Sequence, residues 1–416
     1  MMRAIVVAGC VVAAGAWADP RCENPTWSTI DDFVLPGAVS SSAGAVTQDG
    51  DTLWVAGTAS DTVTSRWVVR RRINRTSPFV TVDDFVYTTG ARNVPSAILV
   101  RSNSVFVSGG ANDSSEVGKW LVRRSTNGGS SWSIADVQSG DSTVSHAYAM
   151  SLDGAGALLV AGYANKPTPS DYHWYTRRST DLGVTWAQID VYTPIVAGTA
   201  PRGMALDKAG SVFAAGYNWN GRQYRWQTRR QTTPGGPWTL VDDWTAITDD
   251  FAYSANATFG AQPDAVATGK NPGTALVIGT AYQPDGKPHW VVRRTMDAGA
   301  TWIVVDDLAD CMGRGISFDK KDEKGFYAVG RCRGSAGAYR WITRRSDGFG
   351  SNWVTEDDWA LAAGYSSYGN AIDFGKHGGL YAVGMASDGA TTHWIVRARS
   401  CGAATISATG TSSRRR

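Results

Sequence analysis

The chain has few of the residues on which many enzymes depend. Its 416 residues include four glutamates, five histidines and five cysteines. No Ser/His/Asp or Cys/His arrangement and no phosphate-binding loop stands out, and the alternating Asp or Asn ligands of a calcium loop are absent. These absences argue against the common nucleophilic hydrolases and nucleotide-dependent enzymes, and we expect neither a metal nor another cofactor.

Long apolar runs are also lacking beyond the N-terminus. Residues 1–18 combine Arg3, an apolar run over 4–14 and the sequence Ala-Trp-Ala before Asp19, which is typical of a secretory signal peptide. A lipoprotein signal ending at Cys10 would leave an apolar core that is too short. No later run approaches the roughly 20 residues that span a bilayer. We therefore expect an exported protein, secreted or periplasmic, without a membrane span.

A strong charge of one sign is missing from the body of the chain. The net charge is +3, and Arg3 together with the three arginines of the C-terminal tail more than accounts for it. Nothing here indicates a nucleic acid or an anionic membrane as partner. Residues 406–416 are small, polar and finally basic, which predicts a disordered tail.

What the chain has in abundance is a repeat marked by pairs of aromatic residues. The first member recurs at Trp67, Trp120, Trp174, Trp226, Trp290, Trp341 and Trp394, in steps of 51 to 54 residues and one of 64. The second recurs at Trp27, Phe79, Trp132, Trp186, Trp238, Trp302 and Trp353. This period with strand-like content is typical of propeller blades rather than helical solenoids. Seven copies predict seven blades.

Between the paired tryptophans the sequence predicts a hairpin. The pattern Trp-x-x-Arg-Arg-Ser-x-Asp-x-Gly-x-x-Trp reads as two strands joined by a turn, in which Asp and Ser cap backbone N–H groups and Gly supplies a positive φ. The clearest copies hold Ser179, Asp181, Gly183 and Trp186 in one and Asp297, Gly299 and Trp302 in another. This motif resembles the Asp-box, or BNR, repeat of the sialidase-like propellers. The resemblance covers nearly the whole mature chain and implies the fold, not an activity.

Each unit yields four short strands, which we name A to D from the axis outward. One set covers 203–206, 211–216 and 226–230, followed by 238–243. We predict an all-β protein, a seven-bladed β-propeller of four-stranded antiparallel blades over residues 19–405. The N-terminal strand is expected to be the outermost strand of the last blade and to close the ring.

The cysteines predict two disulfides in the exported chain. Cleavage after Ala18 leaves four of them, Cys22, Cys311, Cys332 and Cys401. Cys22 and Cys401 fall on the same hairpin-tip position, so a bridge between them would complete the ring. Cys311 and Cys332 are expected in a D–A and a B–C loop of one blade, where a second bridge would tie two loops.

Two charged positions repeat in every copy. Arg follows the first Trp by three residues (Arg70, Arg123, Arg177, Arg229, Arg293, Arg344, Arg397), and Asp follows the second aromatic by four (Asp31, Asp83, Asp136, Asp190, Asp242, Asp306, Asp357). They would be seven ligand sites or, as we prefer, repeated ion pairs with Arg stacked on Trp. A basic residue also precedes each first Trp, and the sequence offers no account of it.

The face that carries the B–C and D–A loops varies between copies and is the expected binding face. An insertion over 244–263 carries Asp249, Asp250 and Tyr253. Nearby B–C loops carry Tyr217, Trp219 and Tyr224, together with Tyr163, Tyr172 and Tyr282. Aromatic rings beside carboxylates suit sugars, although the same rings could serve loop packing.

Hydrolytic machinery of the sialidase kind is incomplete in the sequence. The resemblance implies an arginine triad, a tyrosine paired with a glutamate, and an acidic aspartate. Arg92, Arg202 and Arg314 lie near the starts of A strands but at unequal offsets, and Glu116 alone of the glutamates falls on the variable face. Two of Asp249, Asp250 and Asp310 remain candidates for the carboxylate pair of an inverting glycosidase.

The sequence thus predicts an exported, monomeric propeller that binds a glycan or an extracellular protein through its variable face. Arg202, Arg314 and the aromatic and acidic loop residues named above are the candidate ligand contacts. A sialidase-like glycoside hydrolase and a protein-interaction scaffold are the alternatives.

Overall fold

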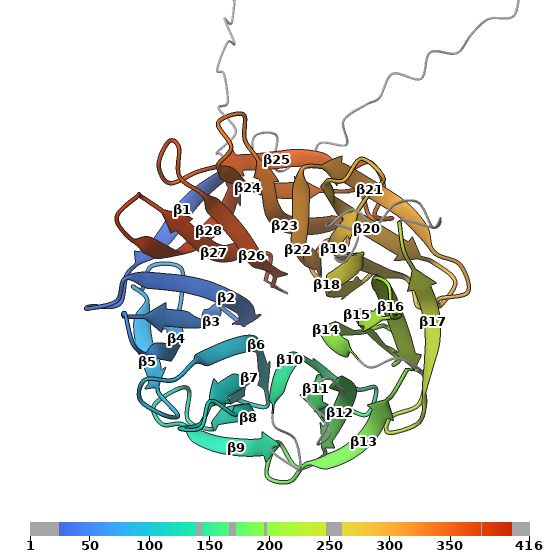
Figure 1. Ribbon diagram of the computed structural model, residues 1–416, viewed down its shortest axis with the longest axis horizontal. Coiled ribbons are helices and arrows are strands. Elements are labelled where there is room, and N and C mark those ends of the chain that lie inside the picture. The colour runs from blue at the N-terminus through green and yellow to red at the C-terminus, as the bar shows by residue number, and fades with distance from the viewer. Residues whose placement is uncertain are drawn as a thin grey trace, which may run out of the picture.

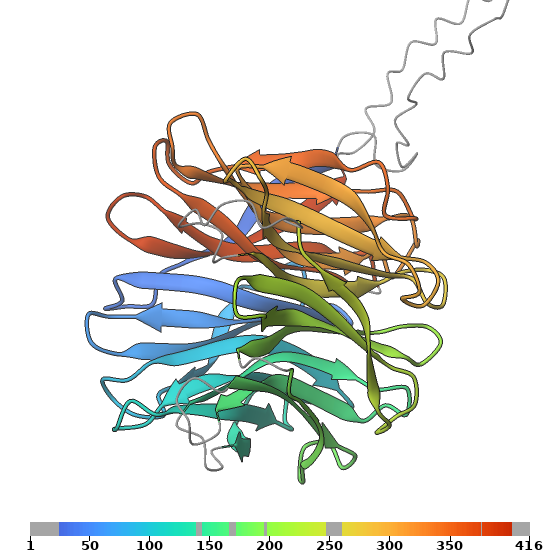
Figure 2. The same ribbon diagram turned by 45° about the vertical axis from the view of Figure 1, so that its right-hand side comes forward.

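The computed structural model describes residues 25–138, 144–165, 172–194, 198–246, 260–375 and 377–401. Within these ranges 28 strands form seven four-stranded blades arranged around an axis (Figure 1). The turned view of Figure 2 shows the same blades following one another around the ring. The expected signal peptide and basic tail lie outside the described residues. Within them, no helix is long and apolar enough to cross a membrane.

The strands fall into four concentric sets. The inner A strands are β2 (Ser40–Asp49), β6 (Asn93–Arg101), β10 (Ser145–Leu152), β14 (Thr199–Leu206), β18 (Ala261–Thr268), β22 (Cys311–Phe318) and β26 (Ser367–Phe374). The B strands are β3 (Thr52–Ser60), β7 (Ser104–Asn112), β11 (Leu158–Asn165), β15 (Val212–Trp219), β19 (Ala275–Tyr282), β23 (Phe326–Arg333) and β27 (Leu380–Ser387). The C strands are β4 (Ser65–Arg72), β8 (Gly118–Ser125), β12 (Tyr172–Ser179), β16 (Tyr224–Gln231), β20 (Pro288–Thr295), β24 (Tyr339–Arg345) and β28 (Thr392–Cys401). The outer D strands are β5 (Val80–Phe85), β9 (Ser133–Gln138), β13 (Ala187–Tyr192), β17 (Trp238–Trp244), β21 (Ile303–Ala309), β25 (Val354–Trp359) and β1 (Pro25–Phe33).

The ring closes as the repeat predicts. The last blade consists of β26, β27 and β28, and the N-terminal strand β1 pairs antiparallel with β28, with Trp27 opposite Arg399 and Phe33 opposite Trp394. The predicted fold class is therefore confirmed. Cys22 and the side chain of Cys401 lie outside the described part, so the bridge between them stays a prediction.

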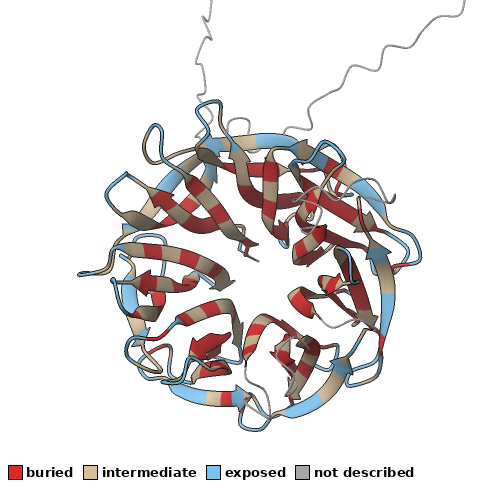
Figure 3. Ribbon diagram, viewed as in Figure 1, coloured by how far each residue is buried: buried red, intermediate tan, exposed pale blue. Residues whose placement is uncertain are grey.

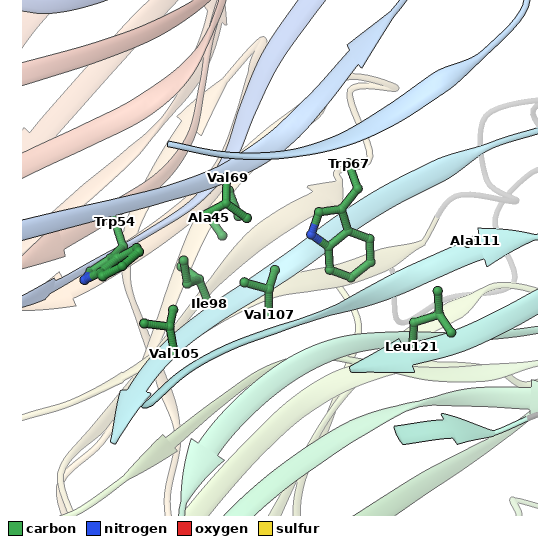
Figure 4. Close-up of a cluster of buried hydrophobic side chains, with 10 residues drawn as sticks. Ala45, Trp54, Trp67, Val69, Ile98, Val105, Val107, Ala111 and Leu121 are labelled. Carbon is green, nitrogen blue, oxygen red and sulfur yellow. The ribbon is translucent and has the colours of Figure 1, made fainter. Parts of the chain in front are cut away.

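The blades are held together by side chains between neighbouring sheets, because each inner sheet face needs an apolar partner. Burial is concentrated in the inner three strands of each blade, and exposure in the outer strands and loops (Figure 3). Figure 4 shows the cluster between the first two blades, where Trp54 and Trp67 face Ile98, Val105 and Val107. The first Trp of every repeat is at most 1% exposed.

Close approach to a glycine explains how these tryptophans fit. Trp120 packs against the B strand of the next blade at Gly162, where a Cβ atom would lie 2.5 Å from the indole. Such a contact is far shorter than real Cβ contacts, so only glycine is accommodated. Glycine and tryptophan therefore repeat with the same period.

The Asp-box turns have the expected hydrogen bonds. The Gly183 N–H donates to Ser179 Oγ (2.8 Å), and the Thr185 N–H donates to Asp181 Oδ1 (2.9 Å). Gly183 has a φ of +80°, which other residues rarely adopt. Hydrogen bonds from the Thr185 side chain and backbone lower the pKa of Asp181. The box is thus a turn-stabilising device, and the side chains of Ser179 and Asp181 are hydrogen-bonded within the turn.

The repeated arginines pair with the repeated aspartates of the preceding blade, not with a strand of their own blade. The pairs are Arg70–Asp31, Arg123–Asp83, Arg177–Asp136, Arg229–Asp190, Arg293–Asp242, Arg344–Asp306 and Arg397–Asp357, at 2.5 to 2.9 Å. Several guanidinium groups also stack on an aromatic residue of that neighbouring blade; Arg123, for example, lies 3.8 Å from the centroid of Phe85. The preferred structural interpretation holds, with the correction that the pairs link blades.

The basic residue before each first Trp also has a structural partner. In five blades it meets the second Asp of the outer strand of the same blade, in the pairs Arg66–Asp84, Arg225–Asp243, His289–Asp307, Arg340–Asp358 and His393–Asp32. Lys119 instead pairs with Asp113, and His173 hydrogen-bonds to Thr193. The ring of basic residues therefore fastens the C strand of each blade locally.

Cys311 and Cys332 form the second predicted disulfide. The structure corrects their expected place: they lie in strands β22 and β23, directly opposite each other in the ladder, rather than in loops. The bridge fastens the inner two strands of the sixth blade at the end that faces the variable loops. A persistent disulfide is consistent with an exported protein.

Candidate functional site

Every inner strand contains a β-bulge at the same point. The register of each A–B ladder shifts there, leaving one inner-strand residue unpaired. The seven bulge residues are Gly44, Ser96, Tyr148, Arg202, Asp264, Arg314 and Asn370. The surroundings of this position therefore differ from blade to blade, whereas each repeated C-strand arginine has the same kind of partner in every blade.

The bulge residues are the accessible positions of otherwise buried strands. In β10 the exposure alternates, with His146 and Tyr148 partly exposed between buried neighbours. Arg202 is likewise partly exposed between buried neighbours, and Asp264 is partly exposed together with Ala265. Since alternate residues of a strand share one side, the bulge residue and the residue two before it face the same space. These positions build the candidate site at the inner end of the blades.

Arg202 lies at the centre of one group of aromatic side chains. Its guanidinium carbon is 4.1 Å from the centroid of the Tyr148 ring and 5.3 Å from that of Tyr217. Tyr148 in turn stacks on Tyr163 at 5.8 Å and on His146 at 4.3 Å. We call His146, Tyr148, Tyr163, Arg202 and Tyr217 the Arg202 cluster.

The Arg202 cluster holds its positive charge without a carboxylate within ion-pair distance among the described residues. Burial opposes that charge, but Tyr148, Tyr217 and the more distant Asp264 carboxylate together raise the pKa of Arg202. Burial also raises the pKa of Tyr163 and Tyr217, so both phenols keep their protons at neutral pH. The cluster combines a charged donor with neutral hydroxyl donors.

His146 is uncharged in this environment. Burial, with Arg92 and Arg202 in addition, lowers its pKa to about 3. Its Nε2 shares a hydrogen bond of 2.7 Å with Ser96 Oγ, the bulge residue of the preceding blade. Its Nδ1 packs against Gly110, where a Cβ atom would lie at 2.2 Å. His146 is therefore a fixed, neutral wall residue.

A cavity of about 240 Å³ opens beside the cluster between the second and third blades. Arg92, Glu116, His146 and Tyr163 are among its lining residues. Glu116 and Tyr163 both line this cavity. Among the described residues, however, no hydrogen bond joins the two, and Glu116 accepts one from Asn112 Nδ2 (3.2 Å).

The six aromatic residues expected in B–C loops lie instead within the ends of strands β11, β12, β15, β16 and β19, and five of them build or extend the cluster. Tyr224 contacts Tyr217 at 5.0 Å and Trp219 at 5.1 Å between ring centroids, and Tyr172 contacts Tyr163 at 5.1 Å. Five of the six aromatic residues selected from the sequence thus belong to two adjacent blades and form one array. This arrangement provides ring faces beside a cation.

The structure places Arg92, Arg202 and Arg314 of the expected triad, and the candidate Asp310, in different surroundings. Arg202 and Arg314 hold equivalent bulge positions, whereas Arg92 lies one residue before β6 and lines the cavity, so the three are not equivalent. Arg314 Nη1 is 2.9 Å from Asp264 Oδ1 and is neutralised by it. Asp310 receives a hydrogen bond from Lys287 Nζ (2.7 Å).

Asp249, Asp250 and Tyr253 lie outside the described residues, so their part in the site stays a prediction. Among the described bulge residues and the residues two before them, Asp264 is the only carboxylate. Nor do the described residues include a group of three or more His, Cys, Asp or Glu side chains that could hold a metal ion. Within the described part, the site is better equipped to bind an anion than to perform carboxylate chemistry.

Sequence reasoning missed His146, Tyr148 and Asp264. The signal was present as an inner-strand position whose residue type varies strongly between repeats, but the position is identifiable only when the bulge is known. Tyr148 is the clearest case, because it contacts both His146 and Arg202.

Comparisons with known proteins support the fold. No protein-family model matches the chain, and no curated protein sequence matches it. Among solved structures, a polysaccharide lyase of family PL25, an ulvan lyase, is similar with a TM-score of 0.55 and 10% identity over 88% of this chain and 96% of that chain. A Trypanosoma rangeli sialidase is similar with a TM-score of 0.45 and 10% identity over 87% of this chain and 55% of that chain. A protein of unknown function from Dyadobacter fermentans DSM 18053 gives 0.48 and 12% over 90% and 99%.

At such identities the likeness concerns the fold alone, and of these three only the lyase score exceeds 0.5. Together with the Asp-box turns and the ring closure, it agrees with the resemblance seen in the sequence. The chain has the fold of the Asp-box, sialidase-like β-propellers.

Proposed function

We propose that this chain is an exported propeller that binds an acidic polysaccharide at the Arg202 cluster. The observation that carries the proposal is Arg202 itself, a cation held over Tyr148 and Tyr217 with no ion-pair partner among the described residues. Half-buried charge is costly unless it is paired, so the cluster favours an anionic ligand. A carboxylate or sulfate group fits the planar guanidinium, which binds such groups through two parallel hydrogen bonds.

The neighbouring side chains favour a sugar as the carrier of that anion. Tyr163 and Tyr217 offer protonated hydroxyls, and the rings of Trp219 and Tyr224 lie beside them. Sugar C–H faces pack on aromatic rings while sugar hydroxyls exchange hydrogen bonds with such donors. The cavity beside His146 has room for part of one sugar.

The test is an array of neutral, carboxylated and sulfated polysaccharides probed with the wild-type chain and with Arg202→Gln. The proposal expects retention on acidic glycans only, and a loss of about tenfold or more in affinity for the variant, since a hydrogen bond to a charged group contributes about 1.5–3 kcal/mol. Retention on neutral glycans that Arg202→Gln leaves unchanged would contradict it. Arg101→Gln, on the opposite face, removes the same charge and is the control.

Cleavage of the bound polysaccharide by β-elimination is a second candidate. It is favoured by a neutral imidazole and two protonated phenols grouped around an arginine, since displaced pKa values of this kind gather at active sites. In this reaction Arg202 would bind the uronate carboxylate, and His146 Nε2, once released from its hydrogen bond with Ser96 Oγ, would take the proton from the adjacent sugar carbon. That electron pair forms a C=C bond as the glycosidic C–O bond breaks, and Tyr163 would protonate the leaving oxygen.

The unsaturated uronate product absorbs ultraviolet light, so the same glycans can be assayed in solution. An increase in absorbance with wild type that disappears in Tyr163→Phe supports elimination. New reducing ends without the absorbance would indicate hydrolysis instead and direct attention to Asp249 and Asp250. Retention without either signal leaves binding as the function.

A further inference from the structure

A second arginine lies over tyrosine rings in the sixth and seventh blades. The guanidinium carbon of Arg331 (β23) is 4.4 Å from the ring centroid of Tyr368 (β26) and 5.1 Å from that of Tyr339 (β24). The two rings meet edge to face at 5.7 Å, and Arg331 Nη2 lies 3.0 Å from the Met312 sulfur. We call Met312, Arg331, Tyr339 and Tyr368 the Arg331 cluster. It repeats the chemistry of the Arg202 cluster with different strands.

Arg331 also lacks a carboxylate within ion-pair distance among the residues that the structure describes. Asp264, which could have served, is bound to Arg314 at 2.9 Å. Burial, and then the positive charge of Arg314, lower the pKa of Arg331. A partly buried cation next to another cation is unfavourable without an anion, so this cluster is also prepared for one.

Both clusters lie at the same depth along the axis. The position after the B-strand glycine is Tyr163 in the third blade, Tyr217 in the fourth and Arg331 in the sixth. Each pairs with the inner-strand residue two before the bulge; Tyr163 is opposite His146, and Arg331 is opposite Met312. Equivalent register places the two clusters at the same end of the axis.

The two clusters stand on different sides of that axis. In Figure 1 the inner strands β10 and β14 lie below it and β22 and β26 above it. Asp264 acts electrostatically on both Arg202 and Arg331, so the two arginines belong to one electrostatic environment. Between them, the Asp264–Arg314 pair presents little net charge.

We infer that the Arg331 cluster is a second anion subsite and that the ligand is a linear acidic oligosaccharide with negative groups on at least two of its sugars. Arg202 binds one carboxylate or sulfate and Arg331 binds another. Sugars between them cross the neutral Asp264–Arg314 pair. This inference rests on the proposed function, because it extends the same ligand across the axis.

The test measures binding of a heparin-derived disaccharide and octasaccharide, which carry carboxylate and sulfate groups, by titration calorimetry at two salt concentrations. The proteins are wild type, Arg202→Gln, Arg331→Gln, Arg331→Lys and the control Arg101→Gln. Thermal melting of each variant confirms that it is folded. The octasaccharide has several sugars that can lie between two charged groups, whereas the disaccharide carries its charges on two adjoining sugars.

Arg331→Gln is expected to weaken octasaccharide binding about tenfold and to reduce its salt dependence, because one charge contact is lost. Binding of the disaccharide to Arg331→Gln should weaken by no more than about twofold, because the Arg202 subsite remains and only one of two sites is lost. Arg331→Lys should restore part of the octasaccharide affinity, because the charge returns without the planar stack. A merely structural Arg331 would not produce this dependence on ligand length.

Two results would overturn the inference in distinguishable ways. If Arg202→Gln weakens binding while Arg331→Gln leaves the octasaccharide unaffected, the second subsite is wrong and the proposed function stands. If wild type binds neither probe, the proposed function and the subsite fail together. They also fail together if Arg202→Gln binds both probes as tightly as wild type does.

Discussion

Two sets of arginines in this propeller have opposite arrangements. The C-strand arginine three residues after the first Trp recurs in every blade. Each copy is paired with an aspartate of the preceding blade, as Arg344 is with Asp306. Arg202 and Arg331 occur at positions where no other blade has the same environment, and each lies over tyrosines without an ion-pair partner among the described residues. In this propeller the arginines that repeat are paired between blades, whereas Arg202 and Arg331, which break the repeat, have no such pair among the described residues.

The largest expected effect comes from breaking one inter-blade pair. Arg344→Met leaves Asp306 buried without its counter-charge, and the free energy of unfolding should fall by about 3–5 kcal/mol. Chemical denaturation measures this change. The double variant Arg344→Met with Asp306→Leu should recover most of the loss, since an apolar pair replaces the ions. If the single variant is as stable as wild type, the repeated pairs are not what holds adjacent blades together.

Removal of the disulfide tests a second stabilising contact, in the blade that carries Arg331. Cys311 and Cys332 are 21 residues apart, and replacing both with serine should lower stability by roughly 3 kcal/mol in the chain-entropy model. Wild type under reducing conditions should show the same melting temperature as the double serine variant. A melting temperature that is unchanged by both treatments would show that the β22–β23 hydrogen-bond ladder alone holds these strands together.

Arg202→Gln should have the opposite profile to Arg344→Met. Its affinity for acidic glycan should fall by about 1.5–3 kcal/mol, whereas its stability should change by no more than about 0.5 kcal/mol. Arg202 gives no ion pair to the described fold, so its loss leaves no buried carboxylate behind. A large loss of stability with intact binding would place Arg202 among the structural arginines.

A separate effect on stability is expected from pH. The folded pKa of His146, about 3, lies below the ordinary 6.5, because burial and the nearby Arg92 and Arg202 disfavour its charged form. The unfolded chain therefore takes up this proton first, so the contribution of His146 is fully present above pH 6.5 and declines as pH falls toward 3. The stability of His146→Gln should fall less than that of wild type over this range. Parallel pH profiles would contradict a neutral buried imidazole.

The repeat explains why the fold could be predicted in detail. Tryptophans that must pack on glycine of the next blade recur wherever a blade recurs, as Trp120 and Gly162 show. The Asp-box residues and the closure by β1 follow from the same period. The pairing of Arg with Asp between blades did not follow, because the sequence gives the period of both residues but not which neighbouring sheet each side chain meets.

The site was predictable only in part. Arg202, Tyr217 and Tyr224 were selected for their place near the variable loops, and the structure groups them. Tyr148 was not selected, because a bulge changes which residues of the inner strand face the axis, and a one-residue change of register reverses every side chain. Alternation read from sequence alone cannot locate that shift.

The most direct test is a side-by-side titration of one acidic glycan into Arg202→Gln and Arg344→Met at a temperature where both remain folded. The account predicts that Arg202→Gln loses about tenfold or more in affinity with its melting temperature unchanged, and that Arg344→Met keeps its affinity with a lowered melting temperature. If both variants lose affinity and stability together, the division between repeated structural arginines and unrepeated binding arginines is wrong.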